Sequence, residues 1–92
     1  MLERTVTIRN ALGMHARAAA RFVHAAGAFQ CRITVTREDR ADRLVDGKSI
    51  LGLLLLAAAR GVTIRITADG ADEHEALGVL CGLVDAGFEE EP

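Results

Sequence analysis

Strict alternation between apolar and polar residues in three stretches constrains the fold of this chain most. The stretches are residues 2–9, 31–36 and 62–68, and threonine and arginine occupy most of their polar positions. A period of two is typical of a strand that has one side in a core and the other in water. We therefore expect a sheet that is covered on one face only.

Segments with helical character separate these strands. Residues 16–26 are rich in alanine, the best helix former, and Gly27 follows as a common helix stop. Two more helices are predicted over 49–59 and 71–86, and a charged hairpin turn at 37–42 precedes a short returning strand. The order is βαββαβα, which indicates an α+β fold with one sheet and helices on a single face. A ferredoxin-like arrangement is the alternative, because βαββαβ is contained in that order.

Composition excludes several classes of protein. Ninety-two residues, 50% of them hydrophobic, predict a single small domain over 1–92, and a net charge of -2 gives no field that would attract nucleic acid. The longest apolar run, 50–59, is too short to span a bilayer, and no secretory signal is recognised. Cys31 and Cys81 lack metal-ligand spacing and are predicted to be buried thiols in a reducing compartment. We therefore expect a cytoplasmic protein that binds neither membranes nor nucleic acid.

His15 lies at the junction between the exit of the first strand and the first helix. The first N–H groups of a helix have no partner within the helix, and together with the helix dipole they favour an anion. Arg17 adds a permanent positive charge nearby. A neutral imidazole beside such a cradle suits a group that accepts a phosphoryl, although a histidine in this position is often only a helix cap.

Three segments together resemble the HPr family, the histidine phosphocarriers of the bacterial phosphotransferase system. Residues 10–17 (Asn-Ala-Leu-Gly-Met-His-Ala-Arg) resemble its active-site segment, 46–53 (Asp-Gly-Lys-Ser-Ile-Leu-Gly-Leu) its serine-helix segment, and 61–70 its last strand. The segments occur in family order and spacing. The resemblance implies an open-faced β-sandwich with a four-stranded antiparallel sheet and three helices packed on one face.

The resemblance also implies a chemistry. His15 would take a phosphoryl group on Nδ1 from enzyme I and pass it to an EIIA-type protein, with Arg17 stabilising the phosphate. Ser49 matches the serine that an HPr kinase/phosphorylase modifies in many members, although capping of the second helix is its simpler role. Such a protein is expected to be a monomer without metal or cofactor. It is not an enzyme in its own right, because its partners complete the active site.

The second predicted helix is apolar on all sides, and a domain this small cannot bury it completely. By resemblance, Leu51 and Leu54 occupy positions that family members present to partner proteins. On the first helix, Arg21 and His24 share one face with Arg17. An apolar centre with a basic rim is typical of a transient docking surface. The predicted partner-binding residues are Arg21, His24, Ile50, Leu51, Leu54 and Leu55.

Departures from the family pattern leave alternatives open. Ala18 stands where a proline commonly follows the arginine, which puts phosphoryl retention and partner choice in question. Residues 85–91 and 13–15 resemble the nitrogen-related NPr branch more than the sugar-transport members. An alternative function is an HPr-like regulatory protein that docks partners and is controlled by phosphorylation at Ser49. A nucleic-acid-binding domain is disfavoured, because the chain has only 3 phenylalanines and no tyrosine or tryptophan on which bases could stack.

Overall fold

A computed structural model describes residues 1–90, and four antiparallel strands form its single sheet. The strands are β1 (Leu2–Thr7), β2 (Arg32–Arg37), β3 (Arg40–Asp46) and β4 (Thr63–Asp69). Their order across the sheet is β1-β4-β2-β3, so the first and third strands lie at the two edges. A ferredoxin-like sheet has those two strands in its interior, so this alternative is wrong.

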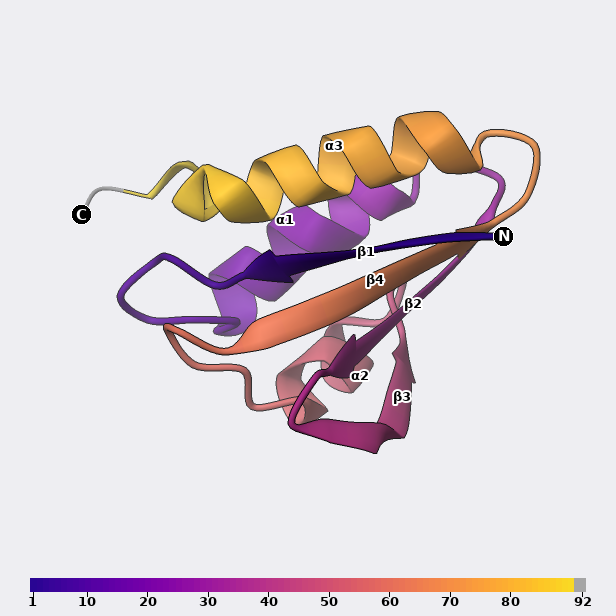
Figure 1. Cartoon of the computed structure of the whole chain (residues 1–92). Helices are drawn as coiled ribbons and strands as arrows, with labels where there is room; N and C mark the ends of the chain where they lie inside the picture. Colours follow the sequence, from indigo (N-terminus) through magenta and orange to yellow (C-terminus); the bar gives the residue numbers. More distant parts are fainter. Residues whose placement is uncertain (91–92) are drawn as a thin grey trace.

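Three helices cover the sheet on one face, as the sequence predicts (Figure 1). They are α1 (Ala16–Ala26), α2 (Ile50–Leu55) and α3 (Glu73–Asp85), and a short 3₁₀ turn, η1 (Gly87–Glu89), follows α3. Helix α3 packs on β1 and β4, and α1 contacts both α2 and α3. Within residues 1–90, no helix has the length and apolar character needed to cross a membrane.

Burial follows the alternation of the strands. The apolar positions Ile33, Val35, Ile64 and Ile66 are at most 1% exposed, whereas the intervening polar side chains are half-buried or exposed over most of β2 and β4. Phe22 of α1 and Phe88 of η1 are also fully buried. The predicted sheet with one wet face is confirmed.

Helix α2 is shorter than predicted, since it ends at Leu55 and not at residue 59. Ala57 has a φ of 51°, a left-handed conformation that stops a helix. Arg37, at the end of β2, donates from Nη1 to the carbonyls of Leu56 and Ala57, both at 3.1 Å. These carbonyls therefore have a partner outside the helix, which no local pattern in 49–59 reveals.

The hairpin between β2 and β3 is also tighter than predicted. Strand β3 begins at Arg40, so most of the charged stretch predicted as a turn belongs to strands. Strand β3 lies at a sheet edge and is exposed along most of its length, which explains why its sequence has no apolar alternation.

Candidate functional site

The loop that leads to His15 is held by backbone contacts to the segment after α2. The amide of Met14 donates to the carbonyl of Ala58 at 2.8 Å, and the Met14 side chain is 4% exposed. Gly13 has a φ of 66°, and a Cβ built on it would meet the Ala58 carbonyl oxygen at 2.5 Å. Only glycine fits this conformation and this approach, so Gly13 sets the position of His15.

Replacing Gly13 with alanine should destabilise the protein by about 3 kcal/mol. An alanine is strained in this left-handed conformation, and its Cβ would also clash with the backbone of Ala58. Urea unfolding followed by circular dichroism measures this change. Gly61→Ala is the matched control, since Gly61 has a φ of 89° but no neighbouring atom within 4 Å of a built Cβ. It should cost about 1 kcal/mol from the left-handed backbone alone. Equal costs at the two positions would contradict the close approach at Gly13.

His15 is the N-cap of α1. Its backbone is extended, with a φ of -79° and a ψ of 179°, and its carbonyl accepts from the amide of Ala19 at 2.8 Å. The ring Nδ1 accepts a hydrogen bond from the backbone N–H of Arg17 at 3.2 Å. The side chain is 24% exposed. His15 therefore presents Nδ1 to the amide groups that open the helix, while part of the ring remains open to water.

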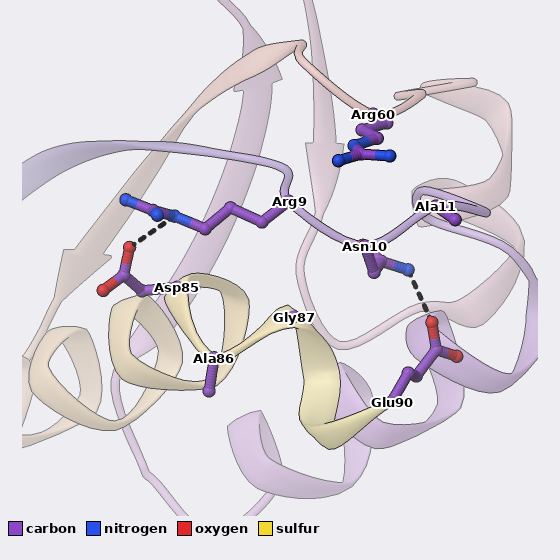
Figure 2. Close-up of a pocket in the computed structure, with 8 residues that line it drawn as sticks. All are labelled: Arg9, Asn10, Ala11, Arg60, Asp85, Ala86, Gly87 and Glu90. Atoms are coloured by element: carbon purple, nitrogen blue, oxygen red, sulfur yellow. Dashed lines mark hydrogen bonds and ion pairs between the residues drawn. The ribbon is translucent and has the colours of Figure 1, made fainter. Parts of the chain in front are cut away.

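The second ring nitrogen has a partner that the sequence analysis missed. Nε2 of His15 lies 2.5 Å from Oε2 of Glu90, and Oε1 of Glu90 accepts from Nδ2 of Asn10 at 2.7 Å. Figure 2 shows the Asn10 and Glu90 side chains pointing toward each other across the loop. The pKa of Glu90 is lowered, mainly by the hydrogen bond from Asn10. Burial raises this pKa, and the contact with His15 lowers it further. Glu90 is therefore an ionised carboxylate beside the ring.

Residues 87–89 fix the backbone that carries Glu90. Phe88 is fully buried although its φ of 57° lies in the left-handed region. Nη1 of Arg21 donates to the Phe88 carbonyl. The half-buried Arg21 thus ties α1 to the segment after α3 and places Glu90 over His15.

The remaining predicted basic residues lie as expected on α1. Arg17 and His24 are exposed, and Arg17 borders a hollow that it shares with Leu12 and Glu90. Leu12, in the loop before His15, is 73% exposed and was not predicted as part of the site. Its exposure adds apolar surface next to the histidine.

Four exposed side chains form an apolar patch on α2: Ile50, Leu51, Leu54 and Leu55, with exposed fractions of 43%, 68%, 37% and 58%. Leu53 and Leu56 point into the core instead. Ser49 caps this helix, because its Oγ accepts from the amide of Gly52 at 3.0 Å. The patch and His15 lie on neighbouring elements, since α1 packs against α2.

Comparison with known proteins identifies the family. A family model described as the phosphorylation site of the PTS HPr component matches residues 2–86. The phosphocarrier protein HPr of Neisseria meningitidis serogroup A is 44% identical over 90 residues, which cover 98% of each chain. The phosphocarrier protein NPr of Shewanella violacea is 43% identical over 89 residues, covering 97% of this chain and 94% of that one.

A solved structure agrees with this match. The crystal structure of HPr-C-His from Thermoanaerobacter tengcongensis superposes with a TM-score of 0.92 at 38% identity, covering 100% of both chains. Relatives named HPr and NPr match almost equally well, so the NPr branch stays a prediction. That prediction depends partly on residues 85–91, and Glu91 lies outside the residues that the structure describes. Sequence, fold and the position of the histidine agree in placing this chain in the HPr family of phosphocarrier proteins of the phosphotransferase system.

Proposed function

We propose that this protein is a cytoplasmic phosphocarrier domain that accepts a phosphoryl group on Nδ1 of His15 from enzyme I and passes it to an EIIA-type protein. The observation that supports this most is the contact between Nδ1 and the Arg17 amide at the start of α1. At 3.2 Å this hydrogen bond is long, so the lone pair can turn to an incoming phosphorus atom. The same N–H then serves a phosphoryl oxygen.

Transfer requires one bond to form and one to break. The Nδ1 lone pair forms the bond to phosphorus, and the bond between phosphorus and the donor's leaving atom breaks with its electron pair staying on the donor. The amides at the start of α1 would face the charge on the phosphoryl oxygens, and the positive charge of Arg17 would help to stabilise it. Passage to the acceptor is the reverse, so moderate stabilisation by an exposed arginine suits a carrier better than tight binding.

The partner is proposed to supply the rest of the active site. His15 is partly exposed, and the apolar patch on α2 lies on a neighbouring helix. Apolar residues at the centre of a transient interface lose water on docking and supply most of the affinity. Enzyme I and the acceptor would both dock on this patch, with Arg17 and His24 at its rim.

Incubation with enzyme I and labelled phosphoenolpyruvate tests the function. The protein should acquire one label per chain that is labile to acid and stable to base, as expected of a phosphoramidate on histidine. An acceptor of the EIIA type should then remove this label. A protein that binds enzyme I without acquiring label would instead have the alternative function of a regulatory docking protein.

Substitution of Ser49 tests whether this residue is only a helix cap or also a regulatory switch. A phosphate here would add about two negative charges next to Leu51 and Leu54 and should repel an acidic partner. Ser49→Asp keeps a capping oxygen and adds one charge, so phosphorylation of His15 by enzyme I should slow about tenfold while thermal stability is kept.

Ser49→Ala is the matched control for that substitution. It removes the hydrogen bond to Gly52 and should cost about 1 kcal/mol of stability, with no loss of phosphorylation rate. Initial labelling rates and thermal melts of both variants give the comparison. If Ser49→Asp accepts label as fast as the parent, Ser49 is a cap and not a switch.

A further inference from the structure

The contact between Glu90 and His15 has no part in the mechanism proposed above. The carboxylate lies 2.5 Å from Nε2, the ring nitrogen that does not receive the phosphoryl. The Glu90 side chain is 13% exposed, so this pair is mostly shielded from water. Ion pairs and hydrogen bonds are stronger where water is excluded, so the contact should influence the ring.

The hydrogen bonds around the ring define which nitrogen carries the proton. Nδ1 accepts from the Arg17 amide and must therefore have its lone pair free. Glu90 is ionised, and an ionised carboxylate can only accept hydrogen bonds, so Nε2 must donate to it. The two contacts select the same tautomer, with the proton on Nε2 and the nucleophilic lone pair on Nδ1.

Asn10 keeps the carboxylate in place. Its Nδ2 donates to Glu90 at 2.7 Å (Figure 2). It also donates to the carbonyl of Gly13 at 2.8 Å, which ties the carboxylate to the loop that carries His15. Asn10 is 7% exposed, and its Oδ1 has no partner among the described residues. Both amide protons of the buried Asn10 are used in these two hydrogen bonds, which hold Glu90 at a fixed position relative to the loop.

From this geometry we infer that Glu90 is a positioning residue for phosphoryl transfer, which holds the His15 ring with Nδ1 free and stabilises the positive charge that the ring gains. This inference rests on the proposed function of His15. As Nδ1 bonds to phosphorus and the leaving atom departs with its electron pair, Nε2 keeps its proton and the ring becomes cationic. The Glu90 carboxylate faces that charge, as a carboxylate does behind the histidine of a catalytic triad.

The ring itself provides a first test that needs no partner protein. In ¹⁵N-labelled protein at pH 8, the Nε2 proton of His15 should give a resonance, because its hydrogen bond to Glu90 slows exchange with water. Glu90→Ala should lose this resonance, while Glu90→Gln should retain it, since the amide oxygen still accepts. Glu89→Ala is the matched control, because Glu89 is exposed and makes no hydrogen bond to the ring. Persistence of the signal in Glu90→Ala would overturn the inference.

Reaction with potassium phosphoramidate provides the second test. This small donor transfers its phosphoryl to histidine, and its P–N bond breaks with release of ammonia, so no enzyme I is involved. The exposed His24 of the same chain serves as an internal reference. The rate at His15 relative to His24 should fall on the order of tenfold in Glu90→Ala and remain unchanged in Glu89→Ala.

These outcomes separate the inference from the proposed function. Circular dichroism and thermal melts check that each variant is folded, and Glu90→Gln should show a reduced rate at His15 although its ring resonance is retained. An unchanged rate ratio in Glu90→Ala would overturn the role of Glu90. Failure of enzyme I to label the parent would overturn the phosphocarrier function, whereas the ring spectrum and the phosphoramidate reaction would still report on Glu90.

Discussion

His15→Ala should accept no phosphoryl label from enzyme I and phosphoenolpyruvate, because the substitution removes the nucleophile. Loss should be complete, unlike the partial slowing expected from removal of a charge such as that of Arg17. The fold should survive, since the His15 side chain is only a cap and a partner of Glu90. Loss of the cap should cost about 1 kcal/mol, which a thermal melt detects. Gel separation of the labelled chain measures the transfer.

The other two histidines provide the controls for this experiment. His24 and His74 are both exposed, and neither lies at a helix N-cap. His24→Ala and His74→Ala should each acquire one label per chain like the parent. Label on His15→Ala would show that another histidine is the carrier, and the proposed function of His15 would then be wrong.

Leu51→Glu should weaken binding to enzyme I by about 30-fold or more, equivalent to about 2 kcal/mol, because a carboxylate would lose water at the centre of an apolar interface. Leu51 is 68% exposed, so the variant should fold with unchanged stability. Titration calorimetry with enzyme I gives the dissociation constant, and labelling at low enzyme I concentration should slow in proportion.

Val79→Glu is the matched control for the patch. Val79 is a 45% exposed apolar residue on α3, outside the apolar patch, and its replacement changes net charge by the same amount. Binding to enzyme I should be almost unaffected. If Leu51→Glu unfolds, Leu51 belongs to the core; if it binds as tightly as the parent, the patch is not the docking surface.

Local patterns predicted the order of the strands and helices and the place of His15 before α1. The alternation in 62–68 and the alanine-rich stretch 16–26 each report on the side chains of one element, so their structure follows from sequence period alone. The position of His15 before α1 is likewise a local property. The exposure of Leu51 was predicted because one helix cannot bury all of its sides.

Contacts between distant segments could not be predicted in this way. Helix α2 ends early, and the carbonyls of Leu56 and Ala57 that follow it accept hydrogen bonds from Arg37, 19 residues before Leu56. No pattern within the helix contains this information. Glu90 contacts a ring 75 residues away, and in the sequence it is one of several acidic residues near the end of the chain. The packing of Phe88, the hydrogen bond from Arg21 and the hydrogen bond from Asn10 bring it to His15.

This separation has a consequence for the order in which the site is assembled during synthesis. His15 and Arg17 leave the ribosome early, followed by α2 with the apolar patch, whereas Glu90 follows His15 by 75 residues. A nascent chain therefore contains the nucleophile and the side chains of the apolar patch before Glu90 has been synthesised. Joining segments this far apart in the sequence costs loop-closure entropy, which the packing of the intervening elements must offset. The pairing of Glu90 with His15 thus marks a chain that has been translated and folded through residue 90.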